Sequence, residues 1–118
     1  AAIACPRRPV INFQADGSAL YTLQALWMQA RESLNITTLI CSNRSYNILN
    51  IEFSRSGITS PGRYAQTLTD LGNPAIDWAQ ISQGMGVPAV AVDSCESLAR
   101  ELKIALDEPG PHLIEMRI

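Results

Sequence analysis

The sequence lacks the long apolar runs and the excess of positive charge that mark membrane and nucleic-acid-binding proteins. No run approaches the ~20 apolar residues that a bilayer-spanning helix needs, and the opening stretch Ala1 to Cys5 is too short for a signal peptide. The formal net charge is −2, and the basic residues are scattered apart from the pair Arg7-Arg8. We therefore expect a cytoplasmic protein that binds neither a membrane nor nucleic acid.

Cysteine and histidine, which supply many metal ligands and catalytic groups, are also rare. Cys5, Cys41 and Cys95 form an odd set without metal-like spacing, which is typical of reduced thiols in the cytosol. We interpret all three as packing residues, because no positioned base accompanies them. His112 is the only histidine, and no pattern brings it near the acidic motif described below, so we do not expect it to be a catalytic base.

Two kinds of apolar segment alternate along the 118 residues, of which 47% are hydrophobic. Short β-branched segments predict four strands, at residues 9–14, 36–41, 87–92 and 112–118. Helical spacing and capping signals predict the intervening helices, at residues 19–33, 46–53, 73–84 and 93–106. The alternation predicts an α/β fold, with a doubly wound, mostly parallel sheet and helices on both faces.

The expected helices carry end signals. Ser18 would cap the first helix, and Asn73-Pro74 would cap and start the third. Asp93 and Glu96 would form a capping box at the start of the last helix.

Three further predictions concern packing and boundaries. Trp27 and Trp78 lie on the apolar stripes of their helices and are expected in the core. Residues 54–72, rich in glycine and serine with little periodicity, are predicted to form a long loop that acts as a lid or a binding loop. Ala1 to Cys5 resembles the last turn of a helix that begins earlier. We therefore expect residues 1–118 to be a partial, N-terminally truncated C-terminal domain of a longer polypeptide.

Polar residues gather where the first two expected strands end. Asp16, Gly17 and Ser18 follow the first strand, and Asn43 and Ser45 follow the second. Successive parallel strands deliver their carboxyl ends to one edge of the sheet, so an acidic oxygen and an amide oxygen should meet there. A helix start beside them attracts phosphate. This combination predicts a hard, oxygen-ligated cation that holds a diphosphate.

Asp16-Gly17 followed by Asn43 resembles the signature of thiamine-diphosphate-dependent enzymes, a Gly-Asp-Gly block that ends further along the chain in a pair of asparagines. Other segments resemble the branch of acetolactate synthase and benzoylformate decarboxylase, namely Asp16–Ser18, Tyr21–Gln24, Leu26-Trp27, Ala30–Glu32, Asn43–Tyr46, Ile48-Leu49, Asn73-Pro74, Asp77-Trp78, Gly84–Val87 and Glu108–Pro111. Nearly the whole chain is covered. The resemblance implies the thiamine-diphosphate-binding fold, with thiamine diphosphate and Mg²⁺ as cofactors.

The resemblance also implies a role for each residue of the polar group. Asp16 and Asn43 would give side-chain oxygens to Mg²⁺, and Ser45 its backbone carbonyl; diphosphate oxygens and water would complete the octahedron. Gly17 and Ser18 would donate backbone amides, and Ser18 its hydroxyl, to the diphosphate. Tyr46 either lines the cofactor pocket or packs under the loop. The cofactor is an electron sink that carries the chemistry, so no catalytic residue is expected within this chain.

Some positions depart from the family pattern. Ala15 stands in place of the first glycine and Ser42 in place of the first closing asparagine, but neither is an expected metal ligand. Asn47-Ile48-Leu49 and Glu52 stand where acetohydroxyacid synthases carry Gly-Met-Val and tryptophan, which is nearer to the decarboxylases. Ile48 and Glu52, one helical turn apart, are our candidates for the substrate pocket. A buried carboxylate at Glu52 would select against acidic acceptors.

The later segments of the chain resemble acetolactate synthases more closely, and the resemblance therefore implies an acetolactate synthase-like enzyme that decarboxylates and ligates 2-oxo acids. Within the family, the alternative is a 2-oxo acid decarboxylase of benzoylformate decarboxylase type. Two interpretations from other classes stay open: a non-catalytic α/β binding module in which Asp16 only caps a helix, and a folded remnant that pairs through an exposed sheet edge.

The resemblance also implies partners. In the family, a glutamate from an amino-terminal domain of the neighbouring subunit activates the cofactor, and a bulky apolar residue that bends it lies well upstream of the Asp-Gly block. We therefore expect further domains, a second subunit in a homo-oligomer, and no turnover by this chain alone. A flavin (FAD), which another domain holds in some relatives, stays open for the parent enzyme and is not expected to bind to these residues.

Overall fold

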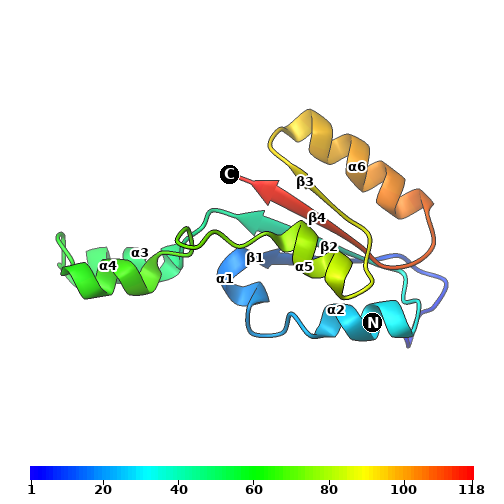
Figure 1. The fold of residues 1–118 in the computed structure, drawn as a ribbon, viewed down its shortest axis with the longest axis horizontal. Helices are drawn as coiled ribbons and strands as arrows, with labels where there is room; N and C mark the ends of the chain where they lie inside the picture. The colour runs from blue at the N-terminus through cyan, green and yellow to red at the C-terminus, as the bar shows by residue number, and fades with distance from the viewer.

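Four β-branched and apolar segments form one parallel sheet in the computed structural model, which describes all 118 residues (Figure 1). The strands are β1 (Val10–Ala15), β2 (Ile36–Ser42), β3 (Ala89–Val92) and β4 (His112–Arg117), in the spatial order β1-β2-β4-β3. Every neighbouring pair of strands is parallel. The predicted strands are therefore confirmed, with their ends shifted by at most two residues.

Six helices accompany the strands: α1 (Asp16–Ala19), α2 (Ala25–Arg31), α3 (Asn47–Arg55), α4 (Arg63–Thr69), α5 (Trp78–Gly84) and α6 (Cys95–Asp107). α1, α2 and α5 lie on one face of the sheet and α6 lies on the other (Figure 1). α3 and α4, which we call the arm, project beyond the carboxyl ends of the strands (Figure 1). The doubly wound α/β arrangement is confirmed, and it follows from the need of a parallel sheet for cover on both faces.

The core consists of two apolar clusters, one on each face of the sheet. The cluster beneath α5 contains Ala19, Leu26, Ile40, Trp78, Val87 and Leu113. The cluster beneath α6 contains Leu39, Val92, Ala105 and Ile114. Alternate residues of the central strands serve both clusters, because successive side chains of a strand point to opposite faces. Trp78 is 0% exposed, which confirms its predicted place in the core.

The single helix predicted at residues 19–33 is wrong, because two short helices take its place. Between α1 and α2 the chain forms turns, in which Thr22 N–H donates to Ala19 O at 3.2 Å and Ala25 N–H donates to Thr22 O at 2.9 Å. Thr22 is β-branched and would lose χ1 freedom in a helix. This lowers its helix propensity and favours a break at its position. Ser18 is not the cap either, since it lies within α1 and its hydroxyl donates to Ala15 O at 2.9 Å.

The prediction of a buried Trp27 is also wrong. This residue is 53% exposed, and the Arg31 guanidinium lies over its ring, 5.4 Å from the centroid. The buried residues of α2 are Leu26 and Gln29, three positions apart. Trp27 follows Leu26 by one residue, or about 100° around the helix, and is therefore turned away from the sheet.

Residues 54–72 and the start of α5 also differ from prediction. Residues 54–72 are not a continuous loop, because α4 lies within them. Asn73-Pro74, joined by a cis peptide bond, does not start a helix; α5 begins at Trp78 and is capped by Asp77, whose Oδ1 accepts from Gln80 N–H at 2.9 Å.

The capping box of α6 is one residue out of register with the prediction of Asp93 and Glu96. Ser94 Oγ accepts from Ser97 N–H at 3.2 Å, and Ser97 Oγ accepts from Ser94 N–H at 3.3 Å. Two serine hydroxyls thus satisfy backbone donors that the sequence pattern assigned to a carboxylate pair.

Cys5 and Cys95 are exposed and Cys41 is half-buried, so only Cys41 packs as expected, and all three thiols are free. Ala1 to Cys5 forms a single turn that closes with Cys5 N–H donating to Ala1 O at 2.9 Å. None of the helices has the length and apolar character that crossing a membrane requires.

Candidate functional site

The candidate site lies where β1 and β2 end side by side. Ala15 and Cys41 are register partners on the parallel strands, so the residues that follow each strand leave the sheet at the same edge. Asp16 begins α1 directly after β1, and Asn43 begins the loop after β2. The backbone therefore brings the two motifs together, as predicted.

Asp16 is the centre of this convergence. The residue is 1% exposed, and its carboxylate accepts two backbone N–H groups: Gly17 N at 2.8 Å to Oδ1 and Arg44 N at 2.6 Å to Oδ2. No lysine, arginine or histidine side chain forms an ion pair with it. Burying a carboxylate away from water is costly unless a charge compensates it. The Asp16 carboxylate is thus a buried negative charge without a cationic protein partner.

The loop after β2 is held in a fixed turn around this carboxylate. Asn43 Oδ1 accepts from Ser45 N–H at 2.9 Å, the bond of an Asx turn, and Arg44 has a left-handed φ of 56°. The Arg44 carbonyl in turn accepts from Leu71 N–H at 2.8 Å. Backbone hydrogen bonds therefore anchor Arg44 on both sides, to Asp16 and to the segment that follows the arm.

The next residues of the loop are tied to Thr69 at the end of α4. Thr69 O accepts from Tyr46 N–H at 2.9 Å and from the Ser45 hydroxyl at 3.2 Å. These bonds fix the position of the Ser45 backbone, whose carbonyl is one of the predicted ligands. The base of the arm is therefore joined to the site by hydrogen bonds.

Tyr46 packs directly on Gly17. A Cβ atom placed on Gly17 would lie 2.6 Å from both Cδ1 and Cε1 of the Tyr46 ring, closer than real contacts allow. Of the two roles left open for Tyr46, packing under the loop is the one visible here. Gly17 is needed at this position because only a hydrogen leaves room for the ring.

The predicted diphosphate donors lie beside Asp16 but make internal hydrogen bonds. Gly17 N–H donates to Asp16, and the Ser18 hydroxyl donates to Ala15 O. α1 is only four residues long. A single turn aligns few peptide dipoles, so its attraction for an anion is weaker than the one predicted from a helix of fifteen residues.

The two substrate-pocket candidates lie on α3, which has no buried residue. Ile48 is exposed, and the Glu52 side chain is 51% exposed and paired with Arg55 at 2.7 Å. Within these 118 residues the Glu52 carboxylate is not buried, and its place in a substrate pocket stays a prediction for the whole enzyme. His112 lies at the amino end of β4, opposite the edge that carries Asp16, and pairs with Glu108 at 3.3 Å.

Sequence patterns missed the backbone of Arg44 as a partner of Asp16, and also Thr69 and Leu71 as anchors of the loop. The Asx-turn pattern Asn43-Arg44-Ser45 was the one signal that could have found the turn. No group of three or more histidine, cysteine, aspartate or glutamate side chains is placed to hold a metal. The predicted ligands do not form a group of that type, since they are one carboxylate (Asp16), one side-chain amide oxygen (Asn43) and one backbone carbonyl oxygen (Ser45).

Comparison with known proteins identifies the family. The family model described as "Thiamine pyrophosphate enzyme, C-terminal TPP binding domain" matches residues 1–116. The Mycobacterium tuberculosis protein named "Putative acetolactate synthase large subunit IlvX" is 50% identical over 117 residues, covering 98% of this chain and 23% of its own length. Benzoylformate decarboxylase of Pseudomonas aeruginosa is 34% identical over 117 residues, covering 98% of this chain and 21% of its own.

A solved structure agrees with these sequences. The thiamine diphosphate-dependent 4-hydroxybenzoylformate decarboxylase of Rhodococcus jostii RHA1 superimposes with a TM-score of 0.88 at 32% identity, covering 99% of this chain and 21% of that one. The chain thus spans about a fifth of the length of the relatives it matches. The match over nearly every residue shows that the chain belongs to the thiamine pyrophosphate enzyme family, as a C-terminal TPP-binding domain.

Proposed function

We propose that the chain binds thiamine diphosphate through a Mg²⁺ ion held by Asp16, Asn43 and the backbone carbonyl of Ser45. The observation that carries this proposal is the buried Asp16 carboxylate, which accepts two backbone N–H groups and has no cationic side chain beside it. A divalent cation at this place would supply the missing positive charge.

The donor set fits Mg²⁺. All three donors are hard oxygens, which this ion prefers. Each Asp16 oxygen accepts one hydrogen bond, as does Asn43 Oδ1, so each retains acceptor capacity for a metal. The Asx turn and the anchors on Thr69 hold Asn43 and Ser45 in place before any ligand arrives, which reduces the ordering cost of binding.

Gly17 and Ser18 are the proposed diphosphate donors. Both lie next to Asp16, and their present internal hydrogen bonds would be exchanged for bonds to phosphate oxygens. When bound, the cofactor supplies an electron sink for the reaction, while these residues bind and orient it. Tyr46 supports the turn by packing on Gly17, which keeps the backbone of residues 16–18 in one position.

The proposed reaction is that of an acetolactate synthase-like enzyme, which decarboxylates 2-oxo acids and ligates the product. The name of the M. tuberculosis relative supports it. The second candidate is a 2-oxo acid decarboxylase, supported by the names of the P. aeruginosa relative and of the R. jostii structure. Ile48 and Glu52 on α3 are the proposed positions that distinguish the two, and a Glu52→Trp change in the whole enzyme should alter the preference among 2-oxo acids. Unchanged selectivity would remove Glu52 from the proposed pocket.

Other domains and a second subunit are the proposed partners that complete the enzyme. Large apolar residues of the arm are exposed, namely Ile48, Leu49, Ile51, Tyr64 and Leu68. Exposed apolar patches of this kind mark protein–protein contacts. Because the activating glutamate implied by the family resemblance belongs to another domain, we expect the 118 residues alone to show no turnover of pyruvate or benzoylformate. Turnover by the chain alone would contradict this.

Calorimetric titration of thiamine diphosphate into the chain tests the binding proposal, first with Mg²⁺ and then with EDTA. We expect heat that requires Mg²⁺, disappears in Asp16→Ala and persists in the control Asp107→Ala, whose carboxylate is exposed and paired with Lys103. Binding that persists in EDTA, or that Asp16→Ala leaves unchanged, would contradict the proposed role of Asp16. If the chain alone binds nothing, the residues are not sufficient for binding, and the same variants must be compared in the assembled enzyme.

A further inference from the structure

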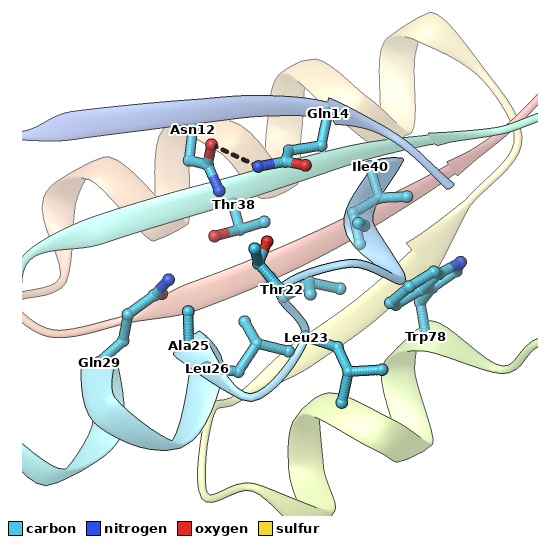
Figure 2. A pocket seen from close by; sticks show the side chains of 12 residues that line it. Asn12, Gln14, Thr22, Leu23, Ala25, Leu26, Gln29, Thr38, Ile40 and Trp78 are labelled. Carbon is cyan, nitrogen blue, oxygen red and sulfur yellow. Dashed lines mark hydrogen bonds between the residues drawn. The ribbon is translucent and has the colours of Figure 1, made fainter. Parts of the chain in front are cut away.

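A small cavity lies between β1–β2 and the segment from α1 to α2, on the face of the sheet that also carries α5 (Figure 2). Its volume is about 40 Å³. One water molecule needs roughly 10–15 Å³ of such space, so the cavity has room for a few waters. Its polar lining residues are Asn12, Gln14, Thr22, Gln29 and Thr38.

Two of these side chains carry buried oxygens that no protein atom satisfies. Gln29 is 8% exposed and Thr38 is 3% exposed, and neither Gln29 Oε1 nor Thr38 Oγ1 has a hydrogen-bond partner. Figure 2 shows Gln29 reaching from α2, and Thr38 extending from β2, toward the same space. A buried polar atom without a hydrogen-bond partner destabilises the fold, so two such atoms around one cavity indicate a shared partner.

A donor for that partner stands on the neighbouring strand. Asn12 is the register partner of Thr38, and its Oδ1 accepts from Gln14 Nε2 at 3.1 Å. That bond leaves the Asn12 Nδ2 group, which Figure 2 shows on the side of Thr38. Trp78 Nε1 is also buried without a partner, but Figure 2 shows it pointing away from Gln29, so it does not belong to this group.

The chemistry of the lining selects the occupant. No charged side chain is among the lining residues, which disfavours a metal ion or an anion. The polar groups are a carbonyl acceptor (Gln29 Oε1), a hydroxyl that can donate or accept (Thr38 Oγ1) and an amide donor (Asn12 Nδ2), and water matches this mixture because it both donates and accepts. Internal waters typically make about three hydrogen bonds to otherwise unsatisfied groups.

We propose that this cavity is an internal hydration site, in which ordered water bridges Gln29 Oε1, Thr38 Oγ1 and the Asn12 amide. The water takes the place of direct apolar contact between α2 and the β1–β2 edge of the sheet. Gln29 is one of the two buried residues of α2, so the amide of one buried side chain of this helix would reach the sheet through water. The proposal does not depend on cofactor binding.

Water–protein nuclear Overhauser measurements on the unaltered chain test the site directly. We expect cross-peaks from water to the Thr38 methyl group and to the Asn12 side-chain amide, with the sign of a water that resides longer than about a nanosecond. Their absence would overturn the proposal. Because no residue is changed, this result does not depend on any variant folding.

Substitutions provide a second test, because a water-bridged Thr38 hydroxyl and an unpartnered one predict different changes in stability when the hydroxyl is removed. Thr38→Val removes the hydroxyl at nearly constant volume. If water bridges it, the folding equilibrium constant should fall about five-fold, the size of one hydrogen bond. If the hydroxyl is unpartnered, its removal should leave stability unchanged or raise it, which would overturn the proposal. Thr37→Val is the matched control, since Thr37 is equally buried on the opposite face of β2, and it should not lower stability.

The double variant tests whether one water serves both groups. Gln29→Met keeps the length of the side chain and removes its amide. If both groups hold the same water, the combined loss in Thr38→Val/Gln29→Met should be smaller than the product of the two separate losses. Independent effects would overturn the shared bridge.

Discussion

The sheet core and the arm use apolar residues in opposite ways. In the core, Trp78 and Ile40 are fully buried between α5 and the sheet. In the arm, α3 has no buried residue, and Tyr64 and Leu68 of α4 face solvent. Both regions have apolar residues at helical spacing, yet only the core finds its cover within these 118 residues. The difference teaches that apolar spacing predicts a helix without identifying what covers it.

The site joins these two regions. Asp16 follows a core strand, whereas Ser45 and Tyr46 are held by Thr69 at the base of the arm. The fold therefore fixes the candidate ligands between a part that is complete within the chain and a part whose apolar surface is not covered. Four predictions separate the contributions of the two regions.

The largest expected effect is in the core. Trp78→Ala should lower the free energy of unfolding by about 3–5 kcal/mol, because it opens a large cavity beneath α5. Trp27→Ala, at the exposed tryptophan, is the matched control and should cost less than about 1 kcal/mol. Urea unfolding of both variants checks this, and similar losses at the two positions would contradict the burial difference.

Next in size is the contact between Gly17 and Tyr46. Gly17→Ala should destabilise by about 1–3 kcal/mol, because the new Cβ meets the tyrosine ring. In a Tyr46→Ala background, the same Gly17→Ala change should cost much less, because the clashing ring is gone. Gly62→Ala is the control, since a Cβ there has no atom within 4 Å. Thermal unfolding measures all four proteins, and equal effects at Gly17 and Gly62 would refute the packing role.

A smaller effect is expected at the start of α6. Ser94→Ala should cost about 1 kcal/mol through loss of the N-cap, whereas Asp93→Ala should cost less. Chemical denaturation of the two variants distinguishes the observed cap from the one predicted by the sequence pattern. A larger loss for Asp93→Ala would favour the original prediction.

The smallest effect on stability is expected in the arm. Leu68→Ser should change the free energy of unfolding of the chain by less than about 0.5 kcal/mol, since the side chain is exposed. The buried counterpart Leu26→Ser should destabilise strongly. In the assembled enzyme, Leu68→Ser should weaken subunit or domain association, which sedimentation velocity measures. An unchanged assembly would remove Leu68 from the proposed contact surface.

The strands and the convergence of the site were predictable because they depend on local composition and on the geometry of parallel strands. β2 is rich in β-branched and apolar residues, and the residues after it must reach the same edge as Asp16. Helix boundaries were less predictable. The break at Thr22 and the cap at Ser94 depend on which of several neighbouring residues makes a local hydrogen bond. The free energies of these alternatives differ by only about 1 kcal/mol.

Long-range features could not be predicted from sequence patterns. The bond from Arg44 N–H to Asp16 joins residues 28 positions apart and uses a backbone group that any residue offers. The exposure of Trp27 likewise depends on where α2 begins, since a shift of one residue turns a helical side chain by about 100°.

The most direct test of the account replaces Mg²⁺ by paramagnetic Mn²⁺ in the presence of thiamine diphosphate and maps the relaxation of backbone amides by NMR. If Asp16, Asn43 and Ser45 hold one cation, enhancement should be strongest at residues 16–18 and 43–45 and should vanish in Asp16→Asn. Enhancement centred on exposed carboxylates such as Asp107 and Glu108, or unchanged in Asp16→Asn, would contradict the proposed metal site.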